Sequence, residues 1–278
     1  MKYTTEAVQP GFVLATSSYQ KILYQKEAII HLYSYTHDIH DNLDVVAIPD
    51  GCIDIMNEIV DGGIYTHVDG TVLKTKIHHH ADNRQYFGLR FYPGILPDIF
   101  DVSMKELICS QISLSEALKN KELAKRLEEA KGAQMWFDLF LHTYHVSMLE
   151  KKADHKSKAR LVQYLRDKIM QTGGQITVNE LADDTLYSTR YLERVFKEAV
   201  GISTKRFSKI MRFQNAIQQI NCNECIQLTD VAIRLGYYDQ SHFVKEFKQF
   251  TDMSPKNYQN MICNSGYRQR IMQKELYS

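Results

Sequence analysis

Two stretches in the C-terminal half of the chain place apolar residues at the spacing of an amphipathic helix. The first has them at positions i, i+3, i+4, i+7 and i+8, namely Leu192, Val195, Phe196, Ala199 and Val200. The second has Phe243, Phe247 and Phe250. A shorter apolar stripe precedes each helix, with Val178, Leu181 and Ala182 in the first copy and Val231, Ala232 and Leu235 in the second. The pattern therefore predicts a helix, a tight turn and a second helix, repeated once.

The two copies keep a common register. Leu192 and Phe243 are 51 residues apart, and so are Ser203 and Ser254, whereas Leu181 and Val231 are 50 apart. The second turn is therefore expected to be one residue longer than the first. Ser188 is expected to cap the second helix of the first copy, and Gly236 suits a left-handed turn position in the second copy.

The opposite face of each second helix is polar. In the first copy it carries Arg190, Glu193, Arg194 and Lys197, and in the second copy Gln240, Ser241, Lys245 and Lys248. Side chains of these types form hydrogen bonds with base edges and phosphates in the major groove of DNA. A generic helical bundle is the alternative reading of the periodicity.

At these residues the chain resembles a known family. The segment from Lys156 to Tyr258 is similar to the tandem helix-turn-helix DNA-binding domain of AraC/XylS-type transcription regulators. Residues 230–258 match best, with the Ala, Gly, paired Phe, Ser-Pro and Tyr of the family at family spacing. The first motif is looser, because Leu186 stands where the family often has a small turn residue.

The resemblance implies roles for individual residues. The candidates for base contacts are Arg190, Glu193, Arg194, Gln240, Ser241 and Lys245. The candidates for phosphate contacts are Ser188, Lys197, Lys205, Lys248 and Lys256. Glu193 would accept a hydrogen bond from cytosine or orient a neighbouring arginine. The helix expected over residues 203–220 would hold the two reading helices ~34 Å apart, one turn of B-form DNA.

Charge is distributed unevenly along the 278 residues, whose total is +1. Residues 151–278 hold 21 Lys and Arg against 13 Asp and Glu, a net charge of +8. Residues 1–150 have a net charge of −7. A basic half beside an acidic half is typical of a DNA-binding domain joined to a regulatory domain.

The N-terminal half is predicted to be β-rich, so the fold class is α+β. Short strands separated by turns are expected at residues 28–35, 44–48, 52–56, 63–68, 71–77 and 85–92. They would form a small antiparallel barrel or sandwich. Residues 48–54 and 88–94 resemble the module that precedes the DNA-binding domain in one branch of the family, which implies a cupin-like sensory or regulatory domain.

Helices are predicted to follow. They are expected over residues 107–118, with Ser113 and Ser115 as candidate caps, over 121–131 and over 134–150. The last would pack against the β-rich part or against the same helix of a second subunit. A polar linker at 150–157 then separates a regulatory or dimerisation domain, residues 1–150, from the DNA-binding domain, residues 156–260.

Other candidate sites are weaker. His78 and His80 would share one face of a strand and His67 is a third candidate ligand, but no Glu follows at the spacing of a cupin metal site, so no metal or other cofactor is expected. Arg90 and Asp54 are expected to form a structural ion pair, with contacts to a ligand as the alternative. The five cysteines are scattered along the chain. Cys222 and Cys225 form one C-x-x-C motif, and a zinc site would need a second such motif, which the sequence does not have. With no signal peptide and no apolar run of ~18 residues, the chain is expected to be cytoplasmic.

The expected partner is double-stranded DNA. A small-molecule effector and RNA polymerase are further candidates, no membrane is expected, and monomer or homodimer is left open. Two other readings stand: a metal-dependent, cupin-like enzyme with a helical appendage, and a DNA-binding protein whose N-terminal half only dimerises. The expected activity is regulatory and not enzymatic.

Overall fold

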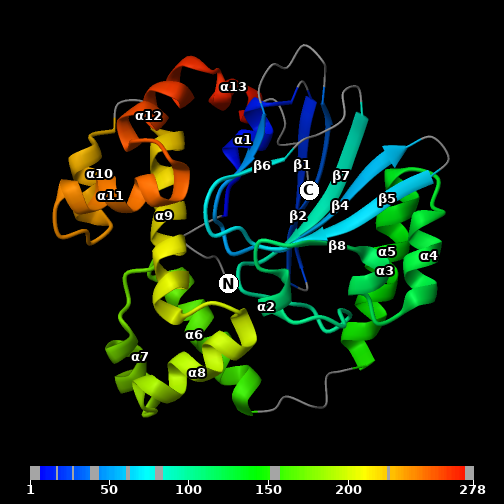
Figure 1. The fold of residues 1–278 in the computed structure, drawn as a ribbon, viewed down its shortest axis with the longest axis horizontal. Coiled ribbons are helices and arrows are strands. Elements are labelled where there is room, and N and C mark those ends of the chain that lie inside the picture. The colour runs from blue at the N-terminus through cyan, green and yellow to red at the C-terminus, as the bar shows by residue number, and fades with distance from the viewer. Residues whose placement is uncertain are drawn as a thin grey trace.

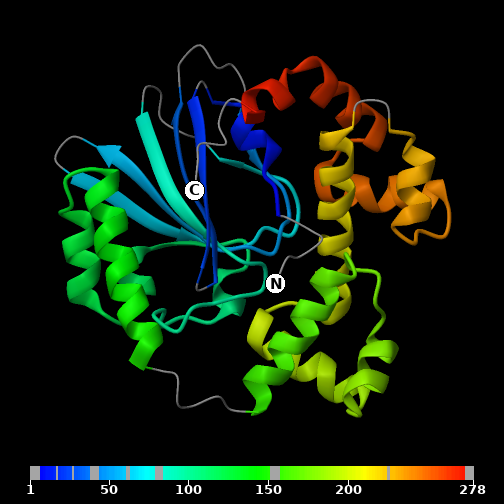
Figure 2. The same ribbon diagram turned by 180° about the vertical axis from the view of Figure 1, so that it is seen from behind.

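The protein consists of a β-rich N-terminal part and a helical C-terminal part that lie side by side (Figure 1). The computed structural model describes residues 7–16, 18–26, 28–37, 44–60, 63–78, 84–150, 157–223 and 226–272. The same arrangement is visible from behind (Figure 2). The predicted α+β fold class is confirmed. In the part of the chain that the structure describes, no helix has the length and apolarity needed to cross a membrane.

The N-terminal part is built on an antiparallel sheet. Its order is β1 (Ser18–Lys26), β2 (Ile29–His37), β7 (Arg84–Phe91), β4 (Asp54–Val60), β5 (Gly63–Asp69) and β8 (Gln111–Ser113). A second, two-stranded sheet joins β3 (Val45–Ala47) to β6 (Lys76–His78).

Two features of these strands differ from the predictions. The strand expected over residues 71–77 is wrong, because only Lys76–His78 pairs as a strand and residues 71–75 form a loop. Strand β1, which was not predicted, lies at the edge of the large sheet and exposes Ile22 and Leu23. The other predicted strands are present, with ends shifted by a few residues.

Among the described residues, five helices of the N-terminal part accompany the sheets, and all except α5 are short. They are α1 (Pro10–Leu14), α2 (Met104–Leu107), α3 (Leu114–Ala117), α4 (Lys121–Glu128) and α5 (Ala133–Glu150). The single helix predicted over residues 107–118 is wrong, since β8 interrupts it to pair with β5. Ser113 starts a new helix there as a capping box with Glu116, as predicted for a cap. Ser115 lies inside that helix and does not cap it.

Helix α5 closes the core of the N-terminal part. Trp136, Phe140 and Tyr144 share one buried face of the helix at i, i+4 and i+8. Trp136 meets Phe87 of β7 edge to face at 5.8 Å between ring centroids, and Tyr144 meets Phe91 in the same way at 6.1 Å. This face of α5 is therefore filled within the chain.

The C-terminal part is entirely helical among its described residues. It contains α6 (Ser157–Gln171), α7 (Val178–Thr185), α8 (Thr189–Val200), α9 (Thr204–Cys222), α10 (Leu228–Arg234), α11 (Gln240–Thr251), α12 (Pro255–Asn264) and α13 (Tyr267–Met272). The long helix α9 runs from the α7–α8 pair to the α10–α11 pair (Figure 1). The helix expected over residues 203–220 is present as α9.

Candidate nucleic-acid interface

The first motif consists of α7 and α8 joined by residues 186–188. Thr177 and Glu180 form a reciprocal capping box at the start of α7. Leu186 ends the helix in the left-handed region, at φ +59°, with its side chain 93% exposed. Ser188 then caps α8 as predicted, because its hydroxyl accepts a hydrogen bond from the N–H of Tyr191 over 3.3 Å.

The second motif consists of α10 and α11. Gly236 adopts φ +71°, as the sequence predicted for a left-handed turn residue. The Asp239 carboxylate caps α11 by accepting a hydrogen bond from the N–H of His242 over 2.6 Å. Helices α7 and α10 begin 50 residues apart, whereas α8 and α11 begin 51 apart. The longer second turn is therefore confirmed.

Both second helices end in the same way. Each has 12 residues and is followed by a left-handed residue, Gly201 at φ +81° and Asp252 at φ +58°. Ser203 and Ser254 then cap the next helices. The buried residues of the two second helices are Leu192, Val195, Phe196 and Val200 in α8, and Phe243, Glu246, Phe247, Phe250 and Thr251 in α11. The prediction that Ala199 is buried is wrong, because its position at the edge of the apolar stripe leaves it exposed.

The structure places the predicted base-contact residues on the exposed faces of these two helices. Arg190 and Arg194 lie one turn apart on α8, and Gln240, Ser241 and Lys245 lie in the first half of α11. Glu193 is only partly exposed, and its carboxylate accepts a hydrogen bond from the N–H of Thr204 over 3.2 Å. That contact gives Glu193 a structural role, so its contact with a base stays a prediction.

The predicted phosphate-contact residues are also exposed. Lys197, Lys205, Lys248 and Lys256 lie along α8, α9, α11 and α12. Lys256 donates a hydrogen bond to the side chain of Gln259 over 3.2 Å.

An aromatic column supports Arg194, and the sequence analysis did not identify it. The rings of Tyr187 and Tyr191 stack at 5.0 Å, and the Arg194 guanidinium lies over Tyr191 at 5.2 Å. Glu198 pairs with Arg194 over 3.6 Å and with Lys158 of α6 over 2.6 Å. The i, i+3 and i+4 spacing of Tyr187, Tyr191, Arg194 and Glu198 is the available signal. These contacts limit the positions that the guanidinium adopts.

Buried charge fixes α11 on α9. Glu246 of α11 is 2% exposed and pairs with Arg212 over 3.0 Å and with Lys209 over 2.9 Å. Burial alone would raise the pKa of Glu246, but Arg212 and Lys209 outweigh it and hold the pKa below its usual value. The Arg212 guanidinium also lies over the ring of Tyr237 at 4.5 Å. The second motif is therefore tied firmly to the spacer helix.

The N-terminal part contacts the same spacer helix. The Gln214 amide of α9 donates a hydrogen bond to the carbonyl of Pro49 over 2.7 Å, and its oxygen accepts one from the N–H of Val8 over 2.9 Å. Arg206 of α9 donates to the carbonyl of Leu73 over 2.6 Å. Thr75 donates to the carbonyl of Phe250 at the end of α11 over 2.9 Å. The N-terminal part is thus hydrogen-bonded to the spacer helix α9 and to α11 of the second motif.

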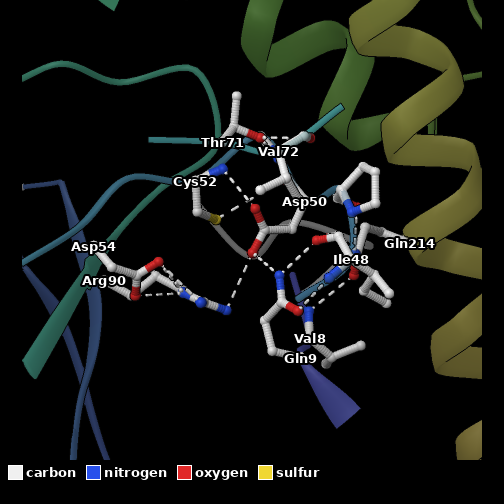
Figure 3. Close-up of polar contacts among 12 residues, drawn as sticks. Val8, Gln9, Ile48, Asp50, Cys52, Asp54, Thr71, Val72, Arg90 and Gln214 are labelled. Carbon is white, nitrogen blue, oxygen red and sulfur yellow. Dashed lines mark hydrogen bonds and ion pairs between the residues drawn. The ribbon is translucent and has the colours of Figure 1, made fainter. Parts of the chain in front are cut away.

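A buried charge cluster lies behind this contact (Figure 3). The predicted ion pair between Arg90 and Asp54 is present at 2.9 Å, on directly paired positions of β7 and β4. Arg90 also pairs with Asp50 over 3.2 Å. Burial raises the pKa of Asp54 to about 6, although Arg90 acts against the rise. The cavity beside these residues has a volume of ≈ 30 Å³, which is room for about one water molecule.

The histidines do not form a metal site among the described residues. His67 pairs with Asp69 over 3.1 Å on β5, and His78 of β6 lines the small cavity. Burial favours a raised pKa for Asp69, but the contact with His67 outweighs it and lowers the pKa. His79, His80 and Cys225 lie outside the described residues. In the described ranges, no three His, Cys, Asp or Glu side chains converge as metal ligands.

Comparison with known proteins identifies the helical part. Residues 181–261 match a family model described as "Helix-turn-helix domain". An uncharacterised helix-turn-helix transcriptional regulator from Haemophilus influenzae is 24% identical over 157 residues, which cover 55% of this chain and 51% of that protein. The transcriptional activator RhaS from Escherichia coli is 22% identical over 209 residues, covering 71% and 72% of the two chains.

Two solved structures are similar to this chain, both with TM-scores below 0.5. The C-terminal domain of AraT from Geobacillus stearothermophilus is 24% identical and covers 38% of this chain and 88% of its own, with a TM-score of 0.35. ToxT from Vibrio cholerae is 11% identical and covers 88% and 99%, with a TM-score of 0.41. The chain spans about half the length of the Haemophilus influenzae relative. Residues 181–261 are a helix-turn-helix domain of the AraC type.

Proposed function

We propose that the chain is a sequence-specific transcription regulator that binds duplex DNA through α8 and α11. The observation that carries the proposal is the repetition of one structural unit on a single rigid spacer. Both second helices have the same length, the same kind of N-terminal cap and an exposed polar face. Helix α9 has 19 residues and is ~28 Å long at 1.5 Å per residue. That length suits two helices in successive major grooves of one duplex.

The proposed division of labour follows from exposure and residue type. Arg190 and Arg194 would read guanine, and Gln240 would read adenine, because each forms two hydrogen bonds with that base. Ser241, Lys245 and Glu193 complete the proposed base contacts. The phosphate contacts are assigned to Lys197, Lys205, Lys248 and Lys256, together with the start of α8 at Ser188. The N-terminal part would act on DNA binding through its contacts with α9. A small-molecule effector, RNA polymerase and a second copy of the chain are partners still to be tested.

The test is selection of binding sites from random duplex DNA, followed by binding titrations with two variants. Arg194→Ala should cost about 1–3 kcal/mol on the selected site and relax the choice of base at one position. Lys248→Ala should weaken binding to selected and scrambled DNA by similar factors and reduce the salt dependence. Lys125→Ala, at an exposed position on α4, is the control and should change neither property. Failure to enrich any sequence would refute the proposed function.

A further inference from the structure

A cleft between the two parts of the chain is lined by positive charge. Its volume is ≈ 710 Å³, and its walls come from residues 72–76, Ile108 and Cys109 on one side and from α8, residues 201–203 and α9 on the other. Among the described residues, the charged side chains that line it are Lys74, Lys76, Lys197 and Arg206, and none of the lining residues is Asp or Glu. In the described part of the cleft wall, these four cations therefore have no acidic residue beside them.

Lys74 and Lys76 give residues 71–77 a positive charge within an N-terminal half that is negatively charged overall. Residues 1–150 have a net charge of −7, yet the loop and short strand that face the DNA-binding half, residues 71–77, hold two lysines and no acid. Lys74 is exposed and Lys76 is half-buried. An acidic domain beside a DNA-binding domain would repel a nearby duplex. Lys74 and Lys76 make the charge of residues 71–77 positive within this acidic half.

The loop is hydrogen-bonded to the spacer helix α9 and to α11 of the second motif. Arg206, in the first turn of α9, donates to the carbonyl of Leu73, and Thr75 donates to the carbonyl of Phe250 at the end of α11. The segment between β5 and β6 lies next to α9 in both views of the molecule (Figures 1 and 2). The loop is therefore attached near the C-terminal ends of both reading helices and is held in place with them.

Lys197 connects the cleft to the proposed DNA-reading face. It follows Arg190 and Arg194 at i+7 and i+3 on the same side of α8, and it is exposed while lining the cleft. A duplex bound by Arg190 and Arg194 would pass beside Lys197, which also lines the cleft. Phosphates are spaced closely enough along a strand for one backbone to contact several cations in a row.

We propose that Lys74 and Lys76 extend the DNA-binding surface onto the N-terminal part, where they contact backbone phosphates next to the one bound by Lys197. This inference rests on the proposed function and adds to it a partner surface in the acidic half. The contacts are with phosphate alone, so they add affinity and salt dependence without adding sequence preference.

The test measures the affinity of the full chain for a labelled duplex carrying the selected site, over a series of KCl concentrations. The double variant Lys74→Gln, Lys76→Gln should reduce the slope of log affinity against log salt by roughly 2, about one for each lost phosphate contact. It should weaken binding to selected and scrambled duplexes by equal factors. The matched control is Lys125→Gln, Lys131→Gln, which removes the same charge from exposed positions on and after α4. The control should keep the wild-type slope.

The outcomes separate the inference from the proposed function. Wild-type protein that binds no duplex would refute the function itself. Wild-type binding with equal slopes in both double variants would refute only the extended surface. Inorganic pyrophosphate serves as a free-anion probe: if the Lys74, Lys76 variant loses pyrophosphate binding in calorimetry but keeps the wild-type salt slope, the cleft is a site for a free anion and the proposed DNA contact is wrong.

Discussion

Gln214 and Pro49 are joined by a hydrogen bond of 2.7 Å that connects the spacer helix to the N-terminal part (Figure 3). Gln214 is fully buried, and the same side chain accepts the N–H of Val8 over 2.9 Å. Phe207 and Met211, on the same side of α9, would touch a side chain placed at Gly51. The contact between α9 and the N-terminal part is therefore polar at Gln214 and apolar at Phe207 and Met211. It lies near the middle of α9, between the two motifs.

Replacing Gln214 with Leu should destabilise the folded chain by about 2–4 kcal/mol. Leucine fills similar space but leaves the buried Pro49 carbonyl and the partly buried Val8 N–H without their partner. A fully buried unpaired group costs about 1–3 kcal/mol, and a partly buried one costs less. Chemical denaturation followed by circular dichroism measures the change. Gln218→Leu, at a half-buried position one turn further along α9, is the control and should stay within about 0.5 kcal/mol of wild type. Equal stability of the two variants would contradict the role given to Gln214.

Leu186→Gly should stabilise the chain by about 1 kcal/mol. Leucine at φ +59° strains the backbone, and its exposed side chain gains little from packing. Leu186→Ala is the matched control, because alanine keeps the same steric penalty at positive φ. Thermal denaturation should give a higher midpoint for the glycine variant alone. A loss of stability in that variant would show that the leucine side chain makes a stabilising contact.

The free energy of unfolding should change with pH because Asp54 titrates at a different pH in the folded and unfolded chain. Its pKa is about 6 in the folded chain and near 4 when unfolded, so the folded state binds the extra proton between these values. The contribution of this carboxyl group to stability is therefore highest at low pH and falls as pH rises from about 4 to about 6. Asp54→Asn lacks this titration. The unfolding free energy of wild type minus that of Asp54→Asn should decrease between pH 4.5 and 6.5, and an increase would contradict the raised pKa.

The repeat explains why much of the helical part was predictable from the sequence. The cap at Ser188 and the left-handed turn at Gly236 depend on neighbouring residues, so local sequence carries the information. The longer second turn follows from the sequence because the first helices of the two motifs begin 50 residues apart and the second helices begin 51 apart. The predicted domain limits of 1–150 and 156–260 stay a prediction.

Features that depend on distant partners were not predictable in the same way. Glu246 lies on the buried side of α11 because Arg212 and Lys209 of α9 meet it there. The two hydrogen bonds of Gln214 join positions 165 and 206 residues apart. Residues 71–75 have the composition of a strand but form a loop, whose residues Leu73 and Thr75 bond to the helical part. Tertiary contacts overrode local preference in this segment.

Rigid spacing of α8 and α11 on one duplex is the central claim, and changing the spacing of the DNA site tests it most directly. The measurement compares the affinity of the full chain for the selected site with its affinity for the same site carrying five inserted base pairs between its two halves. Five base pairs rotate one half by about half a turn, and α9 cannot follow. The account predicts that affinity falls to that of a site with one half scrambled. Undiminished affinity for the lengthened site would contradict it.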